Sequence, residues 1–238
     1  MEHGVLVDGE FEPRELVAIQ AVGFDNPMIG REGTYDGYVM KEINRSYGQL
    51  DVQGRIVLDV GANIGCFSCW ALQRKPLHLI SLEPEINNFN MLKLNTSPVK
   101  WDNKYDLYNS ALHSVETGPS VMYLSKTGKN PGNSSTTPRR GRVEVPISLM
   151  SVSTLKSKHP IIDVAKIDCE GAEYEFIHSL IGAYPDLKEV ALEMHINGFG
   201  LDQAVELHTF MLSQGFTAKI EPRLHNESLW QTLATYVR

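Results

Sequence analysis

The sequence predicts an α/β fold with a mostly parallel β-sheet and an antiparallel hairpin near its C-terminal end. Residues 56–60 form a short apolar run, and glycines and then a helical pattern follow it. This order is typical of a buried parallel strand that turns into a helix. The same order returns at residues 162–167, which end on Asp168. Residues 216–220 and 229–236 flank a turn-forming segment, which indicates a hairpin.

The first 54 residues form an N-terminal extension with weak periodicity. Residues 5–7 indicate a short strand, and residues 30–34 are typical of a loop. Residues 35–47 carry apolar side chains at helical spacing, and Gly48 is a suitable helix stop. We expect this extension to cover one end of the sheet or to form part of a substrate entrance.

The first strand, residues 56–60, leads into a helix predicted over residues 64–72. A second strand is predicted over residues 77–82, and it ends on Glu83. Pro84 is expected to start the next helix, because its fixed φ and missing N–H are tolerated at a first helical position.

The middle of the chain departs from this alternation. A weaker third strand at residues 105–109 leads into Ser110 and Ala111. Residues 121–125 and 143–147 then indicate two strands, which we expect to form an inserted antiparallel hairpin. The segment between them, residues 130–133, consists of residues that strongly favour a turn.

The alternation resumes in the last third of the chain. A short helix is predicted over residues 152–156, and a helix follows Glu170. Residues 189–192 form another apolar strand, and residues 201–214 have the clearest amphipathic helical pattern. The turn of the closing hairpin is expected at residues 222–226.

Composition limits the function classes. The chain has 238 residues and a net charge of −7, which suits one α/β domain and gives no general affinity for nucleic acid. The only evident basic patch, Arg139, Arg140 and Arg142, is expected to be a solvated loop. No apolar run is long enough to span a bilayer, so we expect a cytoplasmic protein without membrane contact.

The three cysteines do not indicate a disulfide framework, since their number is small and odd. Cys66 and Cys69 form a C-x-x-C within the predicted turn and helix, without further zinc ligands nearby. We expect them to be buried, reduced thiols.

Polar residues stand where predicted parallel strands end, which is the edge where open α/β sheets bind ligands. They are Asp59, Glu83, Asp168, Glu193 and His195. An acid at position 83, one βα unit after a glycine turn, can accept hydrogen bonds from both ribose hydroxyls of a nucleoside. The turn itself excludes a dinucleotide, because Asn63 and Cys66 occupy positions where that fingerprint needs glycine. A nucleoside with a methionine tail fits better.

Three segments together resemble the FkbM family of S-adenosylmethionine-dependent methyltransferases: residues 57–65, 82–84 and 164–173. The resemblance covers about residues 56–215, within a methyltransferase domain expected over residues 55–238. It implies a Rossmann-like class I methyltransferase fold with a seven-stranded sheet. It also implies S-adenosylmethionine as cofactor, S-adenosylhomocysteine as product, and O-methylation of a hydroxyl on a sugar or another small molecule.

The resemblance also implies residue roles. The methionine part of the cofactor is expected near Asp59, Gly61, Asn63 and Gly65. Glu83 would hold the ribose, Ser110 and Ala111 would lie beside the adenine, and Asp168 would face the sulfonium and the acceptor. The family often has an acid where this chain has Ser153.

A hydroxyl acceptor must lose its proton, so a general base is expected within hydrogen-bond reach. The candidates are Asp168, Glu170 and His195, and His195 has the most suitable unperturbed pKa. Asp168, Glu193 and His195 could instead hold a divalent metal ion from adjacent strand ends, which the sequence permits but does not predict.

Two other functions remain open at the level of sequence. One is an RNA ribose 2′-O-methyltransferase, although the second lysine of that chemistry has no evident counterpart beside Lys166. The other is a non-catalytic module that keeps the nucleoside pocket and binds a partner. The main expectation is a small hydroxylated acceptor, such as a carbohydrate.

Overall fold

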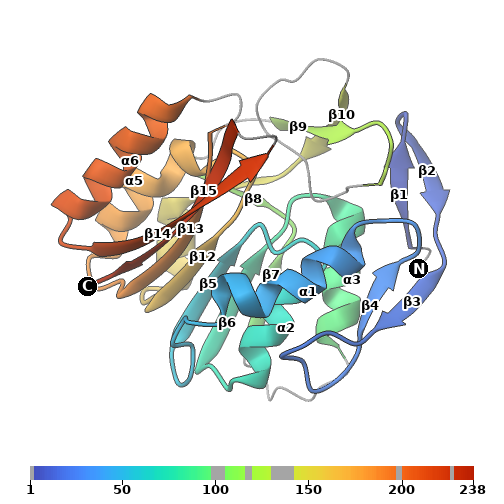
Figure 1. Ribbon diagram of the computed structural model, residues 1–238, viewed down its shortest axis with the longest axis horizontal. Helices are drawn as coiled ribbons and strands as arrows, with labels where there is room; N and C mark the ends of the chain where they lie inside the picture. Colours follow the sequence, from blue (N-terminus) through green and yellow to red (C-terminus); the bar gives the residue numbers. More distant parts are fainter. Residues whose placement is uncertain (1–2, 98–104, 116–119, 130–141, 197–199, 226–227) are drawn as a thin grey trace.

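A computed structural model describes residues 3–97, 105–115, 120–129, 142–196, 200–225 and 228–238. Its centre is a seven-stranded sheet in the order β14-β15-β13-β12-β5-β6-β7 (Figure 1). These strands are β5 (Ile56–Val60), β6 (His78–Leu82), β7 (Tyr105–Tyr108), β12 (Val164–Ile167), β13 (Glu189–His195), β14 (Thr217–His225) and β15 (Ser228–Val237). The first five are parallel, and β15 runs antiparallel to both β13 and β14. The predicted sheet is confirmed.

The strand order reverses between β5 and β12. From β5 the chain adds β6 and then β7 on one side, and it later returns to add β12 and β13 on the other side. Connections leave β5 and β12 in opposite directions, so a crevice opens at the carboxyl ends of these two strands.

Helices cover both faces of the sheet (Figure 1). One face carries α1 (Asp36–Tyr47), α2 (Cys66–Gln73) and α3 (Ile86–Thr96), and the other carries α4 (Val152–Lys158), α5 (Glu173–Ala183) and α6 (Leu201–Ser213). Side chains of a strand alternate between the faces. Val57 therefore packs in the core under α1 and α2, whereas Leu58 and Val60 pack in the core under α5.

The inserted hairpin is confirmed as β9 (Ser120–Ser125) paired antiparallel with β10 (Arg142–Ile147). The expected turn at residues 130–133 and two members of the basic patch, Arg139 and Arg140, lie outside the described residues. Ala111 begins a separate strand, β8 (Ala111–His113), which pairs in parallel with β11 (Leu149–Ser151).

The N-terminal extension holds more strands than the sequence predicts. The expected strand at residues 5–7 is β1 (Gly4–Val7), which pairs with β2 (Glu10–Pro13). A second hairpin joins β3 (Leu16–Ile19) to β4 (Met28–Arg31). The loop predicted at residues 30–34 was therefore wrong at its start, because Gly30 and Arg31 belong to β4.

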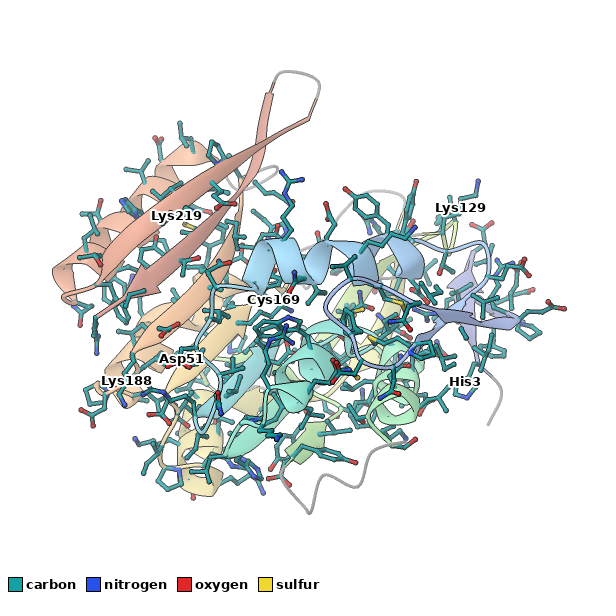
Figure 2. The ribbon with its side chains drawn as sticks, turned by 60° about the horizontal axis from the view of Figure 1, so that its bottom comes forward. His3, Asp51, Lys129, Cys169, Lys188 and Lys219 are labelled. Carbon is teal, nitrogen blue, oxygen red and sulfur yellow. The ribbon has the colours of Figure 1, made fainter. Side chains whose placement is uncertain are left out.

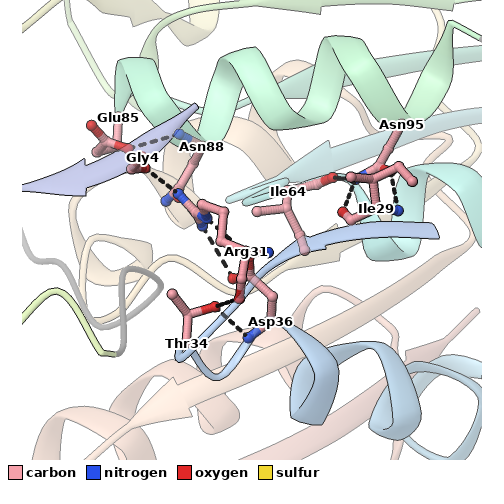
Figure 3. Close-up of polar contacts among 9 residues, drawn as sticks. All are labelled: Gly4, Ile29, Arg31, Thr34, Asp36, Ile64, Glu85, Asn88 and Asn95. Carbon is pink, nitrogen blue, oxygen red and sulfur yellow. Dashed lines mark hydrogen bonds and ion pairs between the residues drawn. The ribbon is translucent and has the colours of Figure 1, made fainter. Parts of the chain in front are cut away.

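A buried arginine ties this extension to α1 and α3 (Figure 3). The Arg31 guanidinium donates to both carboxylate oxygens of Asp36, at 2.9 and 3.1 Å, and to Asn88 Oδ1 at 2.9 Å. It also donates to the carbonyl of Gly4 at 3.2 Å. This one side chain therefore joins β1, β4, α1 and α3.

Several predicted boundaries were wrong by a few residues, and for three of them the structure shows the reason. The helix expected from Ile64 begins at Cys66, because Gly65 has a φ of +91° and cannot be part of an α-helix. The next helix begins at Ile86, after Pro84, because the Glu85 side chain caps it by accepting from Asn88 N at 2.7 Å. The hairpin turn expected at residues 222–226 does not start at residue 222, since β14 continues to residue 225.

The free cysteines Cys66 and Cys69 are buried in α2, as expected. Within the described parts of the chain, every helix is too short or too polar to cross a membrane.

Candidate functional site

A cavity of about 390 Å³ lies at the carboxyl ends of β5, β6, β12 and β13. The turn after β5 and the ends of β6 and β12 form its floor, and α1 forms one wall with Tyr38 and Tyr47. Cys169, one of the lining residues, is near the middle of the molecule beside α1 in Figure 2. The expectation that the N-terminal extension contributes to an entrance agrees with this wall.

The glycine turn after β5 requires its glycines. Gly61 has a φ of +75°, and a Cβ there would lie 1.9 Å from the carbonyl oxygen of Asp168. A Cβ on Gly65 would lie 2.8 Å from Leu92 Cδ1. The turn thus lies directly against the end of β12 and against α3, and it leaves Gly61, Ala62 and Asn63 on the cavity floor.

Glu83 is fixed on the cavity wall by backbone donors. Its two carboxylate oxygens accept from Asn63 N and Glu85 N, both at 2.8 Å. Burial raises the pKa of Glu83 to about 7, although the two N–H groups oppose the shift. Ser110 and Ala111 line the cavity as well, after the neighbouring strand β7. These three predicted nucleoside contacts therefore share one cavity.

Asp59 lies beneath the floor instead of on it. Its carboxylate accepts from Ser68 Oγ at 2.7 Å and pairs with Lys166 Nζ at 3.2 Å. Lys166 also donates to the carbonyl of Gly61 at 2.7 Å. Asp59 therefore holds the glycine turn through Lys166, and it is not among the residues that line the cavity.

Asp168 lines the cavity between α1 and β12. Its Oδ2 accepts from Tyr47 OH at 3.2 Å and lies 4.0 Å from Lys166 Nζ. Burial alone would raise the pKa of Asp168, but the Lys166 ammonium, the nearby His195 and hydrogen bonds bring it below its usual value. Asp168 is therefore a carboxylate at neutral pH.

His195 lies behind the lining residues, at the end of β13. Its Nδ1 is 3.1 Å from Glu173 Oε1, and its Nε2 is 3.6 Å from Glu170 Oε2. Burial alone would lower the pKa of His195, but Glu173, together with two further glutamates, raises it to about 10. At this pKa, His195 carries a proton at neutral pH and would have to lose it before acting as a base, so its predicted role as base stays a prediction.

Two of the polar groups around the cavity were not assigned a role from the sequence. Tyr47 reaches Asp168 from α1, a contact across 121 residues of chain that no local pattern could reveal. Glu173 is fully buried and accepts from His195 N and Gly171 N, both at 2.8 Å. The polar residues on β12 and β13 could be found from strand alternation. Lys166 and Asp168 share one face of the sheet, as do Glu193 and His195.

The strand order reverses between β5 and β12, and the cavity lies at that reversal, lined by the glycine turn and by an acid from the next strand, β6. These features define the class I methyltransferase fold. Within that class, the chain belongs to the FkbM methyltransferase family, because the family's domain, described as Methyltransferase FkbM domain, matches residues 59–218. No curated protein matches the sequence of the chain.

Solved structures agree on the fold. The methyltransferase FkbM from Methylobacillus flagellatus KT aligns at 13% identity and a TM-score of 0.53, covering 92% of this chain and 48% of that one. Trm5b from Pyrococcus abyssi aligns at 12% identity and a TM-score of 0.56, covering 96% and 57%. The methyltransferase yhhF from Escherichia coli aligns at 10% identity and a TM-score of 0.50, covering 94% and 98%. This chain thus spans about half of the FkbM structure.

Proposed function

We propose that this protein uses S-adenosylmethionine to methylate a hydroxyl group on a sugar or another small hydroxylated molecule. The observation that carries the proposal is the position of Glu83. Its buried carboxylate is held by two backbone N–H groups on the wall of the cavity, beside the glycine turn, and Asp168 lines the same cavity. A carboxylate oxygen has two acceptor sites, so Glu83 can still accept from both ribose hydroxyls.

The rest of the cavity suits the remaining parts of the cofactor. Four further residues line the cavity: Ser110 and Ala111 would contact the adenine, and Gly61 and Asn63 the methionine tail. Asp168 faces the sulfonium, whose positive charge favours a carboxylate neighbour.

The transfer is an in-line displacement. The acceptor oxygen forms a bond to the methyl carbon while the carbon–sulfur bond breaks, and its electron pair stays on sulfur to give neutral S-adenosylhomocysteine. Proximity and alignment supply much of the acceleration. Asp168 and Glu170 line the cavity and are the residues placed to receive the hydroxyl proton.

The charge of the cavity supports a small neutral or cationic acceptor. Among the described lining residues, the acids are Glu42, Glu83, Asp168, Glu170 and Glu193, and the single cation is Lys166. Lys166 is buried and paired with Asp59. Protein contacts to nucleic acid depend on exposed lysines and arginines that neutralise phosphates, so this wall disfavours an RNA acceptor.

Calorimetric titration of the purified protein with S-adenosylmethionine tests the proposal. We expect binding that Glu83→Gln weakens by about tenfold to a hundredfold, since hydrogen bonds to a charged group contribute about 1.5–3 kcal/mol. The matched control is Glu12→Gln, which changes an exposed acid on β2 and should leave affinity unchanged. The absence of binding at millimolar ligand would refute the cofactor assignment.

Asp168→Asn separates an enzyme from a binding module. If Asp168 acts at the transfer step, this variant keeps cofactor affinity within a few-fold and loses methyl transfer to sugar acceptors. Unchanged transfer would contradict the role of Asp168. Salt-sensitive RNA binding by the wild-type protein would favour the RNA alternative instead.

A further inference from the structure

Strand register brings Asp168 and Glu193 side by side. β12 and β13 are parallel neighbours with Lys166 opposite Ala191, so two residues further on Asp168 comes opposite Glu193. His195 follows on the same face of β13. One ligand atom from each of Asp168, Glu193 and His195 lies within 4.8 Å of the others.

The ring of His195 is oriented from behind. Glu173 Oε1 lies 3.1 Å from Nδ1, and it also accepts from the backbone N–H of His195 at 2.8 Å. Because Glu173 is fully buried and its other oxygen accepts from Gly171 N, its carboxylate cannot turn away. A carboxylate that fixes one imidazole nitrogen, and thereby points the other nitrogen at a site, is the usual support of a metal-binding histidine.

Several carboxylates gather around this group, and Glu193 Oε1 also accepts from Gln231 Nε2 at 2.5 Å. The carboxylates are Asp59, Asp168, Glu170, Glu173 and Glu193. The cations that pair with them in the described part of the chain are Lys166 and His195. Lys166 lies nearer to Asp59, at 3.2 Å, than to Asp168, at 4.0 Å, so its charge is shared away from the Asp168–Glu193 pair.

We propose that Asp168, Glu193 and His195 bind a divalent first-row transition-metal ion, which holds the acceptor hydroxyl beside the cofactor. One imidazole nitrogen and two carboxylates suit Mn²⁺, Fe²⁺ or Zn²⁺ better than Mg²⁺. Asp168 and Glu193 line the cavity, so the remaining coordination positions face the space where an acceptor binds.

This inference rests on the proposed function for the role of the ion. The ion would polarise the acceptor hydroxyl as a Lewis acid, and Glu170, whose side chain is 27% exposed, would take the hydroxyl proton and pass it to solvent. With an ion held by Asp168, Glu193 and His195, the acceptor oxygen would form its bond to the methyl carbon as the carbon–sulfur bond breaks. The electron pair of that bond stays on sulfur, and the ion keeps its charge throughout.

Binding of Mn²⁺ alone, followed by electron paramagnetic resonance without S-adenosylmethionine, tests the site. We expect one bound ion per chain and at least a tenfold loss of affinity in both Asp168→Asn and Glu193→Gln. Nitrogen-14 coupling from an imidazole should appear in the spin-echo spectrum. Asp106→Asn is the matched control. Asp106 lies with His78 and His159 in a separate cluster, toward the amino ends of β6 and β7 and away from the cavity.

Unchanged Mn²⁺ affinity in Asp168→Asn, with a thermal transition like that of the wild type, would overturn the proposal. So would a loss of binding in Asp106→Asn alone, since it would place the ion at the other cluster. Glu193→Gln provides a second, independent change if Asp168→Asn does not fold. Titration of the same samples with S-adenosylmethionine separates the two proposals, because cofactor binding without metal binding refutes only the metal site.

Discussion

Gly61 shows at the level of one residue how the chain makes room for a ligand. Its φ is +75°, and a side chain there would meet the carbonyl of Asp168 at 1.9 Å. We predict that Gly61→Ala destabilises the protein by more than about 2 kcal/mol, because it combines backbone strain with a clash against main chain. It should also reduce cofactor affinity at least tenfold, since the floor must shift. Urea unfolding and calorimetry measure the two effects.

Gly182 is the matched control for this prediction. It lies in α5, and a Cβ there would meet nothing within 4 Å. Gly182→Ala, in the last turn of α5, should therefore be neutral or stabilise the protein by up to about 0.5 kcal/mol, and leave cofactor affinity unchanged. Equal losses from both substitutions would contradict the argument from close approach.

Glu83 predicts a pH dependence of stability. Its pKa in the folded protein is about 7, above the ordinary value of 4.5, because burial disfavours the charged form. The folded state thus holds this proton more tightly than the unfolded state, so the contribution of Glu83 to stability is lost as pH rises from about 4.5 to 7. Relative to the wild type, Glu83→Gln should gain up to about 3 kcal/mol over that range.

Urea unfolding of both proteins at pH 5 and pH 8, without ligand, measures this difference. The comparison cancels the titration of groups common to both proteins. A difference that does not change between the two pH values would show that the Glu83 carboxyl group titrates normally in the folded state.

At the level of elements, the Arg31–Asp36 pair predicts how the extension is attached. Both side chains are at most 2% exposed, and Arg31 also bonds Asn88 on α3. Arg31→Met leaves a buried carboxylate without its partner, so we expect a loss of about 3–5 kcal/mol of stability. Adding Asp36→Asn should restore part of the lost stability. Both charges are then removed, and the amide oxygen of residue 36 can still accept from the backbone N–H of residue 31.

The exposed pair of Arg14 and Glu12 provides the control. Arg14→Met should cost less than about 1 kcal/mol, as exposed ion pairs do. A double variant no more stable than Arg31→Met alone would show that packing of the arginine side chain, and not the unpaired charge, determines the loss.

Elements also show where sequence reasoning succeeds. The strand at residues 56–60 was predicted with its bounds, because a buried parallel strand is a continuous apolar run. The strands β2, β3 and β4 have four residues each, too few for a period to emerge, and β2 is exposed throughout. The cavity residues at strand ends followed from topology, whereas Tyr47 came to Asp168 through tertiary packing that no local pattern contains.

At the level of the whole molecule, the N-terminal extension completes one of the two cores. Its buried apolar side chains pack with Val57, Phe67 and Trp70 in a single cluster. They are Ala21, Phe24, Met28, Met40, Ile43, Tyr47, Leu50 and Val52. Each large one contributes about 1.5–3 kcal/mol of transfer free energy when it leaves water, so removing them takes away a large part of the apolar burial in this core.

We therefore predict that residues 55–238, the span of the expected methyltransferase domain, do not fold cooperatively when expressed without the extension. Removal of residues 1–54 uncovers the face of the sheet under α1, exposes Trp70 and Phe67, and removes the Tyr47 wall of the cavity. The fragment should bind a hydrophobic dye, show a broad thermal transition and lack cofactor binding, whereas the full chain unfolds in one step. Because the other core, under α4, α5 and α6, draws nothing from the extension, helical circular dichroism should persist in the fragment. A sharp transition with intact cofactor affinity would show that the sheet and the helices after residue 55 suffice for the fold.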